Sequence, residues 1–204
     1  PLTWNMDIRQ IEARLTPRTR AILVVHIYGL PVDMDPLLKL AEAHGLWVVE
    51  DAAEMHGQTY KGRPCGSFGH AGIFSFYANK HVTTGEGGMI VADDEGIAER
   101  CRSYRNLCFG QTQRFRHEDL GWNCRMTNMQ AALGCAQLER LDEFVQRKRR
   151  MGAIYTRLLA DVPGIRLPLE KTDYGENIYW VYGIVLGPTI PFTAEEARRR
   201  LENE

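Results

Sequence analysis

Residues 71–90 read AGIFSFYANKHVTTGEGGMI, and this stretch decides how the rest of the chain is interpreted. It predicts a buried strand, a short polar turn that carries Lys80, and a glycine-rich return into a second apolar strand. A lysine held between two strand ends in an apolar setting is poorly solvated, which lowers the pKa of its amine. The neutral amine is the nucleophile that forms Schiff bases with carbonyl compounds. The competing interpretation, which an isolated lysine would favour, is a surface turn residue without chemistry.

The chain before this stretch predicts a strand, a helix and a second strand with short connections. Residues 21–27, AILVVHI, form a nearly continuous β-branched run, typical of a strand buried on both faces. A helix is expected over 35–44 with Gly45 as its stop, and LWVV at 46–49 predicts the next strand. This order predicts a right-handed βαβ unit in a mostly parallel sheet, hence an α/β fold. Asp51 then stands at the carboxyl end of a strand, where functional groups of such sheets collect.

Weaker patterns fill in the remaining elements. We expect helices over 6–15 and 97–104, strands over 74–77 and 88–92, and irregular chain over 52–70 and 106–123. Thr127 should cap a long helix that continues to about residue 162, where Val-Pro-Gly breaks it. A strand over 179–186 and a helix opened by Thr193 resemble the start of a second, smaller domain. The opening at Pro1 and the close inside an apparent helix suggest a piece of a longer polypeptide.

Composition excludes several classes of function. A net charge of -1 gives no electrostatic case for nucleic acid or for an anionic membrane surface. No apolar run is long enough to cross a bilayer, and the first residues do not resemble a signal peptide. The five cysteines are scattered and show no metal-ligand spacing, so we expect no metal site and free thiols in a reducing cytosol.

Four side chains match what pyridoxal phosphate needs from a protein. Lys80 can bond to its aldehyde, Asp51 can keep the pyridine nitrogen protonated, Ser75 can hold the phosphate, and Glu54 can lie near the ring oxygen. Each has a plainer interpretation. Asp51 is equally well a helix N-cap, Ser75 is more often a satisfied strand hydroxyl, and Glu54 alone suggests a solvated loop carboxylate. Pattern and spacing therefore indicate an α/β protein whose lysine–carboxylate pair could serve a cofactor.

Three segments carry a resemblance to a known family. VVEDAAEMHGQTYKGRPCGSFG, FSFYANKHVTTGEGGMIV and GWNCRMTNMQAALGCAQL closely resemble the DegT/DnrJ/EryC1/StrS family of nucleotide-sugar aminotransferases. The resemblance covers nearly the whole chain and implies a fold-type I pyridoxal phosphate-dependent transferase. It implies that residues 1–160 belong to the large cofactor-binding domain, whose N-terminal portion lies outside this sequence. Residues 161–204 would begin a smaller C-terminal α+β domain.

The resemblance also assigns roles by position. Lys80 matches the lysine that bonds to the cofactor, Asp51 the carboxylate on its pyridine nitrogen, and Ser75 the phosphate-binding hydroxyl. Glu54 stands near the ring oxygen, where many members have glutamine. Asn123 matches an asparagine that reaches the cofactor phosphate of the partner subunit, which implies a homodimer with shared active sites. Arg125, two residues on, is a neighbour of Asn123 in that role.

The implied reaction moves an amino group from an amino acid, by analogy glutamate, to C4 of a nucleotide-linked 4-keto-6-deoxysugar. Such a cytoplasmic enzyme would serve polysaccharide or O-antigen biosynthesis. EDAAEMHG, NKHVTTGEGG and RNLCF are most similar to members that act on a GDP-linked sugar. One alternative is a pyridoxal phosphate-dependent sugar dehydratase, although that branch of the family replaces the lysine with histidine. The other is a member that acts only as a regulator.

Overall fold

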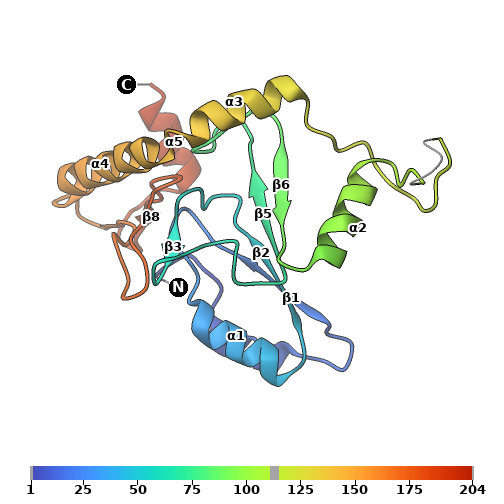
Figure 1. Ribbon diagram of the computed structural model, residues 1–204. Helices are drawn as coiled ribbons and strands as arrows, with labels where there is room; N and C mark the ends of the chain where they lie inside the picture. Colours follow the sequence, from blue (N-terminus) through green and yellow to red (C-terminus); the bar gives the residue numbers. More distant parts are fainter. Residues whose placement is uncertain (1, 111–114, 204) are drawn as a thin grey trace.

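The computed structural model describes residues 2–110 and 115–203 and is organised around a four-stranded sheet (Figure 1). The strand order is β1 (Ala21–Val25), β2 (Trp47–Asp51), β5 (Ala71–Ser75) and β6 (Gly88–Val91). β1, β2 and β5 run parallel, whereas β6 pairs antiparallel with β5. The prediction of a mostly parallel α/β sheet is therefore confirmed.

Helix α1 (Met34–Ala43) connects β1 to β2 and covers one face of the sheet (Figure 1). Pro36 lies in its first turn, where a missing N–H costs nothing, and Gly45 follows its end with φ +59°. Its apolar side chains meet those of alternate strand positions. The buried core on this face comprises Ile22, Val24, Val32, Met34, Leu37, Ala41, Leu46, Val48, Ala52, Met55, Tyr60 and Cys65.

The opposite face of the sheet is uncovered by the residues that the structure describes. Side chains alternate along each strand, so Leu23, Trp47, Ile73 and Ile90 turn away from α1 and are exposed. The prediction that 21–27 is buried on both faces is wrong for the described chain. A β-branched run favours double burial, but only one layer of helix packs here.

The segment before β1 forms two short 3-10 helices, η1 (Ile8–Gln10) and η2 (Glu12–Arg14), rather than the single helix expected over 6–15. Asp7 caps the first turn by accepting the N–H of Arg9, and Ile11 separates the two turns. The apolar spacing was nevertheless informative, because Ile8, Ile11 and Leu15 pack against the core.

The chain between β2 and β5 folds into turns and a short hairpin, β3 (Thr59–Tyr60) and β4 (Arg63–Pro64). Lys61 and Gly62 form the tip of this hairpin, and both have positive φ. No helix occurs between Asp51 and Ala71, all of which the structure describes. The alternative that Asp51 caps a helix is therefore wrong.

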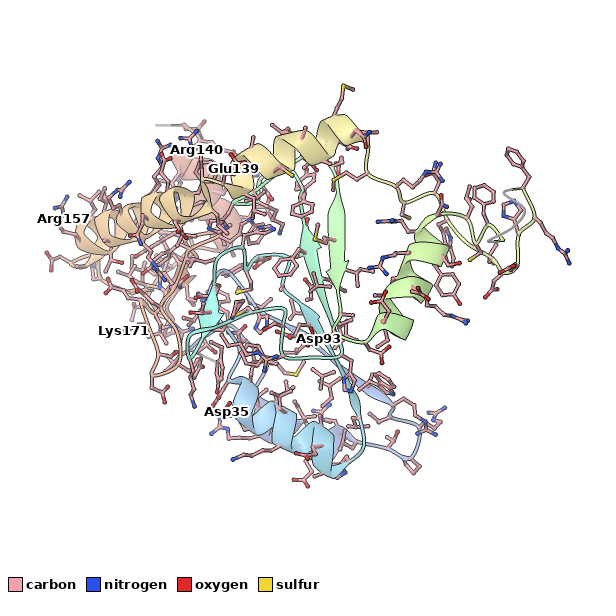
Figure 2. All side chains as sticks on the ribbon, viewed as in Figure 1. Asp35, Asp93, Glu139, Arg140, Arg157 and Lys171 are labelled. Carbon is pink, nitrogen blue, oxygen red and sulfur yellow. The ribbon has the colours of Figure 1, made fainter. Side chains whose placement is uncertain are left out.

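Among the described residues, the helices between β6 and β7 are α2 (Glu95–Arg105), α3 (Asn128–Leu138) and α4 (Leu141–Leu159). Thr127 caps α3 as predicted, and its capping box with Gln130 is complete. The single long helix expected after Thr127 is broken at Glu139 and Arg140, which mark the junction in Figure 2. Arg140 leaves helical geometry there, with φ -110° and ψ 14°.

The last segment contains β7 (Ile165–Arg166), β8 (Val185–Leu186) and α5 (Ala194–Leu201), which Thr193 caps as predicted. The strand expected over 179–186 is mostly wrong, because Tyr179 adopts φ 49° and strand geometry covers only its last two residues. Backbone groups of residues 178–180 instead bond to Tyr28 and Gly29. Within the described ranges, no helix combines the length and the apolar character that crossing a bilayer requires.

Candidate active site

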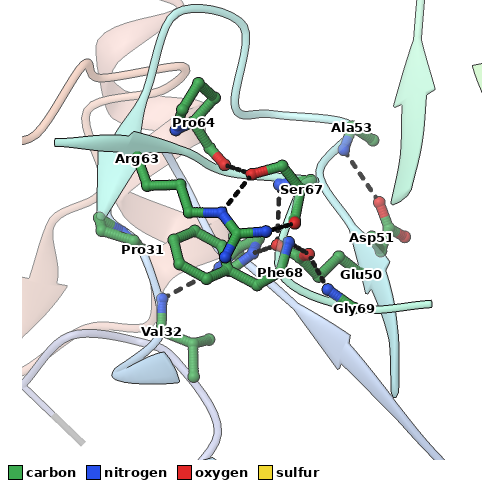
Figure 3. Close-up of polar contacts among 12 residues, drawn as sticks. Pro31, Val32, Glu50, Asp51, Ala53, Arg63, Pro64, Ser67, Phe68 and Gly69 are labelled. Atoms are coloured by element: carbon green, nitrogen blue, oxygen red, sulfur yellow. Dashed lines mark hydrogen bonds and ion pairs between the residues drawn. The ribbon is translucent and has the colours of Figure 1, made fainter. Parts of the chain in front are cut away.

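The end of β2 is fixed by a buried carboxylate that sequence reasoning left without a role. Glu50 is fully buried, and its oxygens accept the N–H groups of Gly66 at 2.7 Å, Gly69 at 2.6 Å and Phe68 (Figure 3). His26 Nδ1 accepts the N–H of Val32, so its Nε2 carries the proton that faces Glu50 at 3.2 Å.

Burial alone would raise the pKa of Glu50, but His26 and these backbone N–H groups outweigh it and hold the pKa below its usual value. Glu50 thus ties the 66–69 loop to β2. Because its partners lie 16 to 24 residues away, no local pattern could have predicted this role.

Lys80 lies in the turn between β5 and β6, where its backbone N–H donates to Tyr77 O at 3.0 Å. Only 9% of its side chain is exposed. Burial lowers the pKa of its amine, although the carboxylates of Glu54 and Asp51 oppose that shift. The alternative of a solvated surface lysine is therefore wrong. Burial shifts the protonation equilibrium of this amine toward its neutral form.

Glu54 and Asp51 supply negative charge beside that amine. Glu54 Oε1 lies 4.0 Å from Lys80 Nζ, and Glu54 Oε2 accepts the N–H of Tyr28 at 2.6 Å. The Glu54 side chain is 15% exposed and burial raises the pKa of its carboxyl group, so it is not a solvated loop carboxylate. Asp51 ends β2 and uses one oxygen to accept the N–H of Ala53 at 3.0 Å (Figure 3).

Ser75 is the last residue of β5 and shares a sheet face with Asp51. Asp51 pairs with Ile73, and Ser75 lies two residues further along the strand, so all three side chains point to the same side. Ser75 Oγ accepts the N–H of Tyr77 at 3.3 Å, which leaves its own proton available. The structure is compatible with both interpretations of this hydroxyl.

The glycines after Lys80 close the turn in a conformation that side chains disfavour. Gly85 and Gly87 have φ 80° and 151°, and a Cβ on Gly87 would approach Thr84 Oγ1 to 2.7 Å. Glycine suits both positions because it lacks the Cβ that disfavours positive φ. They return the chain from the Lys80 turn into β6.

Two buried histidines flank the lysine. Neither ring nitrogen of His56 has a hydrogen-bond partner among the described residues, and the ring stacks on Phe76. His81 Nε2 lies 3.1 Å from Ile178 O. Burial lowers the pKa of both imidazoles, that of His56 to about 4. Burial therefore favours the neutral form of both rings.

Trp180 is a contact that sequence reasoning missed. The Lys80 amine lies 3.8 Å from the centroid of the Trp180 ring. The indole N–H of Trp180 donates to Asn79 O at 3.1 Å. The two residues are a hundred positions apart, so only tertiary structure brings them together. The predicted strand over 179–186 gave no reason to place Trp180 at the site.

Asn123 lies apart from this cluster, on the exposed segment that precedes α3. It forms an isolated bridge with Asn106, whose side-chain oxygen accepts a hydrogen bond from Arg125 at 2.7 Å. No hydrogen bond or ion pair in the described ranges joins Asn123 to Lys80, Asp51 or Glu54. The structure therefore brings together Lys80, Glu54 and Asp51 but not Asn123.

Among the described residues, no group of three histidine, cysteine, aspartate or glutamate side chains could hold a metal ion. The reactive groups that lie together at the Lys80 turn are an amine and two carboxylates. This set suits a cofactor or substrate with a carbonyl group.

Comparison with known proteins identifies relatives of the whole chain. The family model described as the DegT/DnrJ/EryC1/StrS aminotransferase family matches residues 1–203. GDP-perosamine synthase from Caulobacter vibrioides is 41% identical over 202 residues, which are 99% of this chain and 54% of that protein. The chain spans about half the length of the curated relatives it matches.

Solved structures give the same result. The aminotransferase TlmJ from Streptoalloteichus hindustanus aligns with a TM-score of 0.91 and 32% identity, over 100% of this chain and 55% of its own. The E. coli GDP-4-keto-6-deoxy-D-mannose-3-dehydratase with bound hydrated PLP aligns with a TM-score of 0.88 and 26% identity, over 99% of this chain and 56% of its own. The fold is therefore that of these pyridoxal phosphate enzymes.

Proposed function

Because the chain belongs to the DegT/DnrJ/EryC1/StrS aminotransferase family, we propose that this protein is a pyridoxal phosphate-dependent sugar aminotransferase. It moves an amino group from an amino acid, glutamate by analogy, to C4 of a nucleotide-linked 4-keto-6-deoxysugar. The similarity to GDP-perosamine synthase supports a GDP-linked sugar and a role in polysaccharide biosynthesis. The observation that carries the proposal is the buried, poorly solvated amine of Lys80 beside the carboxylates of Glu54 and Asp51.

The residues present fit the cofactor. Lys80 offers a poorly solvated amine to its aldehyde, and Asp51 offers a carboxylate to its pyridine nitrogen from the end of β2. Ser75, on the same sheet face as Asp51, has a hydroxyl proton for the phosphate. Glu54 stands beside the amine, where it can hydrogen-bond near the ring oxygen. When bound, pyridoxal phosphate supplies an electron sink that stabilises negative charge on the reacting carbon.

The protein's own groups then divide the proton work. Lys80, once free as an amine, removes a proton from the α-carbon of the donor and later delivers one to C4 of the sugar. Burial lowers the pKa of this amine and so favours the neutral form that a base requires. Asp51 holds a proton on the pyridine nitrogen throughout. Glu54 orients the Lys80 amine by charge and is itself fixed by the N–H of Tyr28.

Asn123 is proposed to serve the active site of a partner subunit. Its exposure and its bridge to Asn106 support that role, as does the exposed apolar side of α3, where Met129 is 84% exposed. Coexpressing Lys80→Ala and Asn123→Ala chains tests it. Mixed dimers would contain one intact site and regain activity that neither variant shows alone. No recovery would place Asn123 outside the shared site.

We also propose the domain division and the location that the family implies. Residues 1–160 carry the sheet and the Lys80 turn and would belong to the cofactor-binding domain, while 161–204 would begin the smaller one. Five free thiols suit a reducing cytoplasm. Limited proteolysis near residue 160 and cell fractionation test these two points.

The dehydratase is the second candidate, because a structure of that activity aligns over nearly the whole chain. Lys80 favours transamination, since it keeps an amine where the dehydratase branch is expected to carry histidine. The deciding experiment gives the full-length protein pyridoxal phosphate, glutamate and a panel of nucleotide keto-sugars. Mass spectrometry should find nitrogen on the sugar. A deoxygenated sugar without nitrogen would indicate the dehydratase, and no product with any substrate would favour a regulator.

A further inference from the structure

A segment from the C-terminal part of the chain crosses the turn that carries Lys80. His81 Nε2 lies 3.1 Å from Ile178 O, and the indole N–H of Trp180 donates to Asn79 O at 3.1 Å. The turn is thus held on both sides of the lysine by residues about a hundred positions later. The backbone N–H of Trp180 donates to Tyr28 O at 3.1 Å. This bond anchors the crossing segment to the chain just beyond the end of β1.

The indole ring of Trp180 covers the lysine amine itself. Lys80 Nζ lies 3.8 Å from the ring centroid, nearer than the 4.0 Å that separates it from Glu54 Oε1. The backbone of Trp180 is fixed further by Lys148, whose ammonium group donates to Trp180 O at 2.9 Å. Tyr28 packs against the ring at 6.1 Å between centroids. The ring therefore has little freedom to leave the amine.

Such a ring affects the amine in two opposing ways. Its π face favours the charged ammonium, and its bulk excludes the water that a charge needs. Glu54 and Asp51 also favour the charged form, and the imidazoles of His56 and His81 lie close enough to interact electrostatically with Lys80. Loss of solvation is nevertheless the largest influence on the pKa of Lys80, and it lowers that pKa. The Trp180 ring, 3.8 Å from the amine, is among the groups that exclude water from it.

We propose that Trp180 is a positioning residue for Lys80: its ring excludes water from the amine, and its N–H fixes the turn that carries it. The importance of this arrangement for catalysis rests on the proposed function. The arrangement itself concerns only residues of this chain, so it can be measured without cofactor or sugar. A dry amine in one orientation is what both bond formation and proton transfer require.

The test measures the pKa of Lys80 in the cofactor-free, full-length protein. Acylation by an amine-reactive reagent is followed across pH by peptide mass spectrometry, and the midpoint gives the pKa whatever the accessibility of the amine. Trp180→Ala should admit water and raise the midpoint by about one unit, which lowers the neutral fraction near pH 8 roughly tenfold. An unchanged or lower midpoint would overturn the proposal.

Two further variants distinguish the effect of the Trp180 ring on the Lys80 midpoint from a general effect of removing a large side chain. Trp180→Phe keeps an aromatic ring over the amine and should leave the midpoint close to that of the unaltered protein. Trp47→Ala removes an exposed indole from the outer sheet face and should not move it. If Trp180→Ala does not fold, Trp180→Leu should shift the midpoint upward by a smaller amount, and absence of that shift would contradict the proposal.

These results are distinguishable from failure of the proposed function. A raised midpoint in Trp180→Ala supports the positioning role even if the protein aminates no sugar. If the protein aminates a sugar but its Lys80 midpoint is the same with and without Trp180, the proposed function stands and the positioning role of Trp180 is wrong.

Discussion

Two lysines of this chain sit at the turns between paired antiparallel strands, yet their surroundings are opposite. Lys61 lies at the tip of the β3–β4 hairpin, with 52% of its side chain exposed and its ammonium 2.6 Å from Asp35. Lys80 lies between β5 and β6, with 9% exposed and its nearest carboxylate oxygen at 4.0 Å. The hydrogen bond to Asp35 raises the pKa of Lys61, whereas burial lowers that of Lys80.

The contrast shows that a turn does not by itself make a lysine reactive. Both turns have positive-φ residues nearby, at Gly62 and at Gly85. What differs is the packing brought in from distant parts of the chain. Lys61 meets one carboxylate in water, whereas Lys80 is enclosed by Glu54 and by Trp180. Both amines have a carboxylate nearby. The two sites differ because water is excluded from the amine of Lys80 and not from that of Lys61.

Replacing each lysine with alanine should give the largest difference. Lys80→Ala removes the group that we propose to bond to the cofactor and to move the protons, so turnover should fall by about 10⁴-fold or more. Lys61→Ala removes an exposed ion pair with Asp35 and a contact with the Tyr60 ring, and should leave turnover nearly unchanged. Formation of aminated sugar, measured by mass spectrometry, checks both. Equal losses in the two variants would mean that burial does not select the reactive lysine.

The carboxylate at the end of β2 gives the next largest effect. Asp51→Asn cannot keep the pyridine nitrogen protonated by charge, so the rate of proton transfer should fall by about 10² to 10⁴-fold while some cofactor stays bound. Asp93→Asn is the matched control, because Asp93 follows β6 and is exposed (Figure 2). Single-turnover kinetics with glutamate measures the step. Normal rates in Asp51→Asn would remove Asp51 from its proposed role.

The pKa values of the two amines should also be shifted in opposite directions in the cofactor-free protein. Because burial lowers the pKa of Lys80 and Asp35 raises that of Lys61, Lys80 should become neutral at lower pH than Lys61. At any pH below both midpoints, a larger fraction of Lys80 is therefore the neutral, nucleophilic amine. Competitive acylation across pH reports both midpoints in one sample. Coincident midpoints would contradict the contrast.

The smallest effect should come from neutralising each partner carboxylate. Glu54→Gln removes a negative charge that raises the pKa of Lys80, so the Lys80 midpoint should fall by up to about one unit. Asp35→Asn should lower the Lys61 midpoint and leave that of Lys80 in place. The same acylation series measures both variants. A rise for Lys80 in Glu54→Gln would show that the two groups do not interact as described.

The sequence predicted the parts of the fold that local patterns control. β-branched runs located β1 and β2, the Asp-Pro and Gly45 signals bounded α1, and Thr127 and Thr193 were correct as caps. Tertiary contacts decided the rest. The strand expected over 179–186 failed because residues 178–180 bond to Tyr28 and Gly29 instead of a neighbouring strand.

The candidate site divides in the same way. Lys80 and Asp51 were found because each stands at a strand end, which is visible in the sequence. Glu54 was a candidate that, by itself, suggested a solvated loop carboxylate, and its burial beside Lys80 became evident only in three dimensions. Trp180 and the Glu50–His26 pair were missed, because their partners are remote in sequence and no spacing marks them.

The central claim is that the enclosed lysine, rather than any exposed one, carries the cofactor. Incubating the full-length protein with pyridoxal phosphate, reducing with borohydride and mapping the peptides tests this directly. We predict one reduced pyridoxyl adduct, on Lys80, with Lys61 unmodified at stoichiometric cofactor. An adduct on Lys61, or one spread over the exposed lysines with none on Lys80, would contradict the account.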